Sequence, residues 1–71
     1  MLPKETVDRI EKNKKRLKNA VSVREKLIVL SDFSKEYDNL TGVSDKNEFR
    51  KLVKYSSEKA LSEIGVSIFI D

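Results

Sequence analysis

The sequence predicts a mainly α-helical protein, a three-helix antiparallel bundle with a short C-terminal β-strand or extended tail. Apolar residues recur at helical spacing in three successive segments. The two glycines, Gly42 and Gly65, follow two of these segments and are expected to be helix stops. The connecting loops are short, which makes successive helices antiparallel neighbours. We expect one domain over residues 1–71, with helices at about 3–20, 23–40 and 45–64 and an extended tail at 66–70.

The first expected helix, about residues 3–20, has a narrow apolar face. Pro3 suits a helix start, because the N–H group that proline lacks has no partner in a first turn. Lys14 interrupts the apolar spacing, so few residues of this helix are expected to be buried. The apolar positions are Val7, Ile10, Leu17 and Val21.

The second expected helix, about residues 23–40, is the most hydrophobic and is expected to lie at the centre of the fold. Ser22 and Glu25 form an S-x-x-E capping box, which satisfies unpaired N–H groups of the first turn. Ile28 falls on the side opposite the apolar face. That face consists of Val23, Leu27, Leu30, Phe33, Tyr37 and Leu40, and is widened by Val29.

The third expected helix, about residues 45–64, follows a glycine turn. Gly42 can adopt the left-handed conformation that ends a helix, and Ser44 can cap the helix that follows. The expected apolar face contains Phe49, Leu52, Val53, Ala60, Leu61 and Ile64. Ser56 lies within this face. Gly65 is expected to end the helix as Gly42 ends the previous one.

The tail after Gly65 is apolar and β-branched, which is typical of a strand. No other segment resembles a strand that could pair with it, and an unpaired strand leaves backbone donors and acceptors open to another chain. The tail can fold back over the helices, pair with its twin in a homodimer, or add to the sheet of another protein; alternatively, the chain is a fragment. The expected partner-binding residues are Val66, Ile68, Phe69 and Ile70, with Ile28 and Tyr55 as secondary candidates.

The composition argues against catalysis. The chain has no cysteine and no histidine, which removes thiolate metal ligands, the commonest nitrogen ligand and the usual general base. No apolar run is long enough to cross a bilayer, and the N-terminus lacks the apolar stretch of a signal peptide. We therefore expect no enzyme activity, cofactor, metal, membrane contact or small-molecule substrate, and a cytoplasmic location.

The formal net charge of +3 is concentrated at the N-terminus. Residues 1–20 carry seven bases and three acids, a net +4, whereas residues 21–71 carry eight bases and nine acids, a net −1. This basic segment indicates either a phosphate-binding surface or a solvated helix face with acid–base pairs four residues apart, such as Glu11 with Lys15. It contains no aromatic residue to stack on a base, which favours the solvated face. The candidate nucleic-acid residues are Lys12, Lys14, Lys15, Arg16 and Lys18, with or without Arg50 and Lys51.

A helix–turn–helix is a second route to nucleic acid. The Gly-Val-Ser turn at residues 42–44, followed by a basic helix, resembles helix–turn–helix regulators over about ten residues. The helix carries Lys46, Asn47, Arg50 and Lys51. Asp38 and Glu48 stand where that family has apolar residues, so the match is degenerate and an ordinary helical hairpin explains the turn better.

These features favour a small non-catalytic protein–protein interaction or regulatory module. It is expected to self-associate as a homodimer, or to bind another protein, through its C-terminal strand and exposed apolar residues. The alternative is a DNA- or RNA-binding regulator that uses the basic first helix or the degenerate helix–turn–helix.

Overall fold

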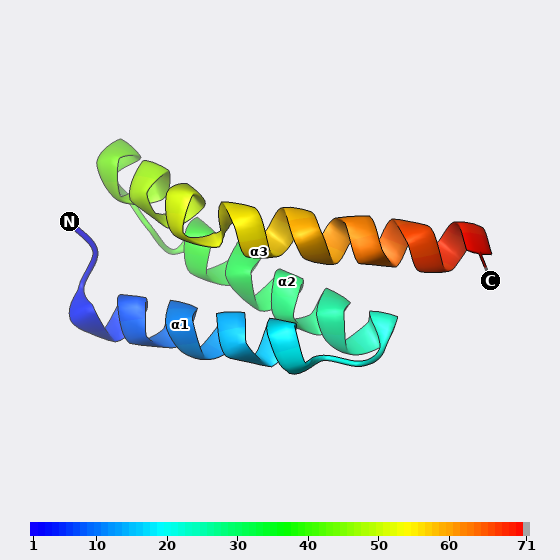
Figure 1. Cartoon of the computed structure of the whole chain (residues 1–71). Helices are drawn as coiled ribbons and strands as arrows, with labels where there is room; N and C mark the ends of the chain where they lie inside the picture. The colour runs from blue at the N-terminus through cyan, green and yellow to red at the C-terminus, as the bar shows by residue number, and fades with distance from the viewer. Residues whose placement is uncertain (71) are drawn as a thin grey trace.

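The computed structural model describes the backbone of residues 1–70 and the side chains of residues 1–66. It confirms a bundle of three helices, each packed against the other two (Figure 1). The helices are α1, Lys4–Asn19; α2, Val23–Asp38; and α3, Val43–Ile70. α3 has 28 residues, against 16 in each of the others, and its C-terminal end projects beyond the loop that joins α1 to α2.

The core lies along the axis of the bundle and is centred on three aromatic rings. Phe49 of α3 meets Phe33 of α2 edge-on, with ring centroids 6.3 Å apart, and lies 5.9 Å from the ring of Tyr37. The buried cluster contains Leu2, Ile10, Leu17, Val29, Phe33, Phe49, Val53 and Ala60. Most of these residues belong to the faces that helical spacing predicts.

The buried side of α2 differs from the predicted one. Val29 is buried at its centre, whereas Leu27 is 50% exposed. Residues two positions apart lie about 200° apart around a helix, so both cannot face the same core. The predicted face was wrong at Leu27 for this reason. Leu61 of α3 is also exposed, and Val21 is 90% exposed because it lies in the loop between α1 and α2.

The turn between α2 and α3 forms without a left-handed glycine. No described glycine has positive φ, so the conformation predicted for Gly42 was wrong. The backbone N–H of Lys46 donates to the Gly42 carbonyl over 3.0 Å, so α3 begins at Val43 and Ser44 lies inside its first turn. The Lys46 ammonium donates to the Tyr37 carbonyl over 3.1 Å and supplies a partner at the end of α2.

The predicted C-terminal strand and the stop at Gly65 were wrong. α3 continues through Gly65 to Ile70, and residues 1–70 contain no strand. A strand without a mate leaves its backbone N–H and C=O groups unpaired, whereas a helix pairs them internally. A glycine inside a helix costs about 1 kcal/mol relative to alanine, which is too little to end one. Val66 is half exposed on this helix, and the side chains of Ile68, Phe69 and Ile70 lie outside the described residues.

Replacing Gly65 tests this correction. A Cβ atom at Gly65 meets nothing within 4 Å, so we expect Gly65→Ala to stabilise the protein by up to about 1 kcal/mol and raise its melting temperature by roughly 4–8 °C. Thermal unfolding followed by circular dichroism measures the change. Gly42→Ala is the matched control, and we expect no gain there because alanine is poor at a helix N-cap. A destabilising Gly65→Ala would indicate a glycine-specific stop instead.

Candidate nucleic-acid interface

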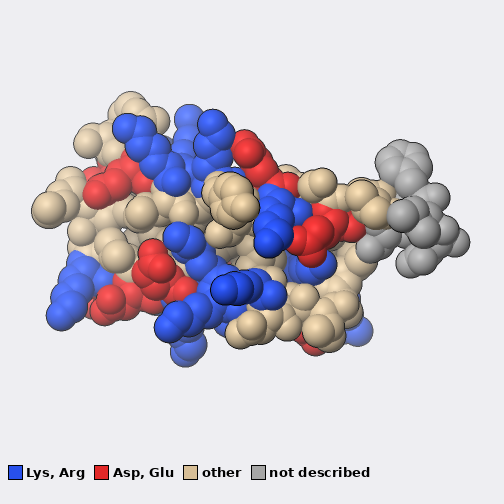
Figure 2. Space-filling view, in the orientation of Figure 1, with Lys and Arg blue, Asp and Glu red and all other residues tan. Residues whose placement is uncertain are grey.

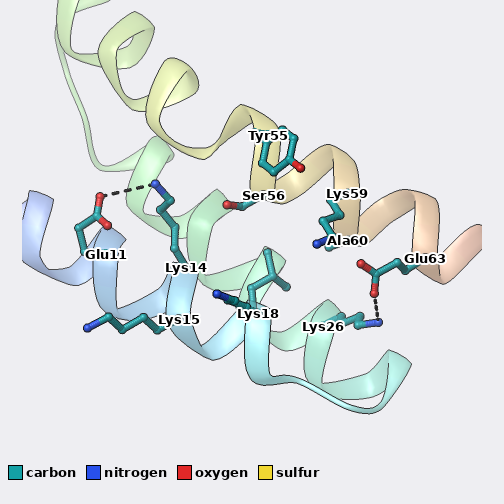
Figure 3. Close-up of a pocket in the computed structure, with 11 residues that line it drawn as sticks. Glu11, Lys14, Lys15, Lys18, Lys26, Tyr55, Ser56, Lys59, Ala60 and Glu63 are labelled. Atoms are coloured by element: carbon teal, nitrogen blue, oxygen red, sulfur yellow. Dashed lines mark hydrogen bonds and ion pairs between the residues drawn. The ribbon is translucent and has the colours of Figure 1, made fainter.

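A cavity of about 360 Å³ lies between α1 and the middle of α3 (Figure 3). Most of its charged lining residues are lysines, five against two glutamates. The lining residues are Glu11, Lys14, Lys15, Leu17, Lys18, Lys26, Tyr55, Ser56, Lys59, Ala60 and Glu63. In Figure 2, blue lysine and arginine side chains gather around the middle of this face of the molecule.

Helical spacing places these side chains together. On α1 the polar lining residues follow an i, i+3, i+4, i+7 pattern, which is one face of a helix. They are Glu11, Lys14, Lys15 and Lys18. On α3, Ser56, Lys59 and Glu63 recur at three- and four-residue steps and line the other side of the cavity, where Glu63 meets Lys26 of α2 (Figure 3).

The cavity lies where the apolar faces of two helices are interrupted. Lys14 breaks the apolar spacing of α1 and Ser56 breaks that of α3, and both side chains line the same space. The Lys14 side chain is only 29% exposed, so its aliphatic part is largely covered by the bundle. Leu17 and the small Ala60, both buried, supply apolar lining at this level.

Both glutamates of the cavity are already paired. The Lys14 ammonium lies 3.6 Å from the Glu11 carboxylate, and the Lys26 ammonium donates to Glu63 over 2.8 Å. Lys15, Lys18 and Lys59 have no ion-pair partner within the part of the chain that the structure describes. Lys15 and Lys18 therefore leave positive charge available to an anionic ligand, and Lys59 does so in part, because its charge also helps to lower the pKa of Glu63.

The Lys26–Glu63 pair depends on pH. The hydrogen bond from Lys26, followed by its charge, lowers the pKa of the Glu63 carboxyl below its ordinary value. Because the pKa of Glu63 is lower in the folded protein than in the unfolded chain, the pair stabilises the fold fully at pH values above the unfolded-state pKa. This stabilisation is lost as the pH falls through the folded-state pKa of Glu63. The ion pair between Lys26 and Glu63 is therefore intact at neutral pH.

Tyr55 places an aromatic ring beside the lysines. Its side chain is 77% exposed and lines the cavity one helical turn before Lys59. The sequence shows no aromatic residue within the basic run of α1, but the fold supplies one from α3. The fold therefore removes one argument for treating the basic run as only a solvated face, namely the absence of a nearby aromatic residue.

The structure separates the predicted nucleic-acid residues into two groups. Lys14, Lys15 and Lys18 line the cavity. The remaining candidates, Lys12, Arg16, Arg50 and Lys51, do not. Lys26 and Lys59 also line it and were missed. Lys59 could have been found from its spacing to Tyr55, whereas Lys26 lies on α2 and only the packing of the helices brings it there.

The two arginines of α1 form ion pairs with α2 and do not line the cavity. Arg16 donates to Asp32 of α2 over 3.0 Å, and Arg9 pairs with Glu36, which also belongs to α2. Glu11 pairs with Lys14 instead of the expected Lys15. Glu36 and Asp32 thus give both arginines of α1 an interhelical partner, because α2 presents carboxylates to that side of the helix.

Residues of the degenerate helix–turn–helix contact Tyr37. Arg50 donates to the Tyr37 hydroxyl over 2.6 Å and lies 5.1 Å from its ring centroid. The Lys46 ammonium lies 4.2 Å from the same centroid. Two of the four expected base-contacting side chains are therefore held against α2, and the helix–turn–helix stays a prediction with less support than the cavity.

Two of the expected partner-binding residues, Tyr55 and Ile28, line different cavities. Tyr55 lines the lysine cavity, whereas Ile28 is exposed on α2 and lines a second cavity with Val23 and Leu27. Among the described residues, no group of three or more acidic, imidazole or thiol side chains is placed to hold a metal ion. Within the same part of the chain, no helix has the length and apolar character needed to cross a membrane.

Comparison of the chain with models of protein families, with curated proteins and with solved structures found no match.

Proposed function

We propose that this protein is a non-catalytic module that binds nucleic acid, and that the lysine cavity between α1 and α3 holds the phosphates. One observation carries the proposal. Lys15, Lys18 and Lys59, which form no ion pair in the described part of the chain, line the same cavity as the exposed ring of Tyr55. A positive groove beside an aromatic ring is the combination that proteins use to bind nucleic-acid strands.

The lining residues support binding better than catalysis. Ser56 has no histidine to activate it, since the chain contains none. The carboxylates of Glu11 and Glu63 are paired with lysines and are poor candidates for a general base. Cysteine-free composition is consistent with the cytoplasm, where we place the protein.

The salt dependence of binding tests the proposal. We expect a fluorescently labelled oligonucleotide to bind at 50 mM salt, because three lysines neutralise phosphates and release counterions. The slope of log affinity against log salt should be about −2 for a single strand and about −2.7 for a duplex, so that affinity falls roughly 15- to 40-fold by 200 mM salt. Fluorescence anisotropy measures both quantities. Absence of binding at 50 mM salt, or binding that ignores salt, contradicts the proposal.

Self-association is a second candidate function. Leu27 and Ile28 are half exposed on α2 and, with Val23, line a cavity of about 510 Å³. Exposed apolar residues that cluster on a helix are typical of interaction surfaces. We expect light scattering to show a dimer that Ile28→Lys converts to a monomer, and a monomeric unaltered protein contradicts this candidate.

A further inference from the structure

We propose that the lysine cavity selects single-stranded nucleic acid, with an unpaired base stacked on Tyr55 and the flanking phosphates held by Lys18 and Lys59. This inference rests on the proposed function and names the form of nucleic acid that the cavity takes.

The exposure of Tyr55 provides the first step. A single exposed aromatic side chain is common on protein surfaces and by itself indicates little. Tyr55, however, is 77% exposed beside a cavity with three lysines that form no ion pair within the described residues. A duplex keeps the faces of its bases stacked inside and offers only edges and phosphates. A base must be unpaired to present its face to Tyr55, as in single strands and loops.

The size and lining of the cavity provide the second step. A volume of about 360 Å³ is near the lower end of the roughly 300–1,000 Å³ typical of small-ligand pockets, which suits one nucleotide-sized group. Leu17 and Ala60 offer apolar surface to a base or sugar. The Ser56 hydroxyl and the Lys14 ammonium are among the polar groups of the same lining.

The identity of the basic residues indicates weak sequence preference. Every cation in the cavity lining is a lysine, and none is an arginine. A lysine ammonium acts as a point charge on phosphate, whereas the planar arginine fork reads guanine edges bidentately. The cavity therefore binds the backbone and one base face, which every base possesses.

Substitution of Tyr55 tests the inference. Three probes of about 12 nucleotides, within the usual site sizes, are compared by anisotropy at one salt concentration: a single strand, a duplex of the same length and an abasic single strand. We expect Tyr55→Ala to weaken single-strand binding about 5- to 150-fold, the loss typical of one stacked base, and to leave duplex and abasic binding unchanged. Tyr55→Phe keeps the ring and should retain single-strand affinity.

Two controls separate the possible outcomes. Val66→Ala removes another exposed side chain from α3 and should leave binding unchanged, and circular dichroism checks that each variant is folded. The stacking inference is wrong if the single strand and the abasic strand bind equally well, or if Tyr55→Ala binds the single strand normally. In either case, binding that weakens with salt would still support the proposed function. If no probe binds at low salt, both proposals are wrong.

Discussion

Phe49→Ala is expected to lower the stability of this protein by about 3–5 kcal/mol, the usual cost of truncating a buried phenylalanine. The melting temperature should fall by roughly 12–40 °C. A 71-residue domain has a total stability of about 4–10 kcal/mol, so this single change removes a large part of it.

The position of Phe49 explains the size of the effect. Its side chain is 2% exposed, and its ring contacts those of Phe33 and Tyr37 on α2. Removal of the ring leaves a void between α2 and α3, and aromatic contacts worth about 0.5–1.5 kcal/mol each are lost with it. In a bundle this small, few other residues can move to fill the space.

Urea or thermal unfolding measures the loss. Tyr55→Ala is the matched control, since it removes an exposed aromatic ring from the same helix and should change stability by less than about 0.5 kcal/mol. A loss below about 1 kcal/mol for Phe49→Ala contradicts the central place given to this ring.

The double variant Lys18→Glu/Lys59→Glu is expected to weaken nucleic-acid binding about a hundredfold or more at 0.1 M salt. Each reversal replaces an attraction for phosphate by a repulsion, which is worth about 2 kcal/mol at contact distance in water. The two lysines come from different helices and line one cavity, so both reversals act on the same ligand.

The matched control is Lys12→Glu/Lys54→Glu. These lysines are exposed on the same two helices but do not line the cavity. Both double variants change the formal net charge from +3 to −1. Because neither lysine lines the cavity, neither is placed to hold a phosphate there, and the control should bind better than Lys18→Glu/Lys59→Glu. If both double variants lose the same affinity, binding depends on net charge alone, and the proposal that the cavity holds the phosphates is wrong.

The sequence predicts the helices well because the signals for them are local. Ser22 caps α2 as expected, since its hydroxyl accepts the Glu25 N–H over 3.1 Å. Ile10, Phe33 and Phe49 are buried as their spacing predicts. The tail was mistaken because β-branched residues favour strands only when a neighbouring strand exists. Without one, the local preference gives way to a helix.

The site is less predictable because it depends on how two helices face each other. The interruptions of the apolar faces at Lys14 and Ser56 are visible in the sequence, but they lie 42 positions apart and nothing local shows that they meet. The same is true of Tyr55, whose distance from the lysines of α1 is set only by packing. Prediction from sequence therefore identified several of the residues but not the surface they form.

The polar interruption at Lys14 and Ser56 also bears on how the chain can evolve. A leucine at position 14 would extend the apolar face of α1 and favour a tighter bundle, and proteins commonly accept such changes with a gain in stability. Lys14 instead keeps the cavity open, and the protein forgoes the extra stability that a leucine would provide. We therefore expect selection for thermostability alone to replace the polar residues of the cavity before others. Laboratory evolution at rising temperature would then show which cavity residues serve ligand binding and which serve folding.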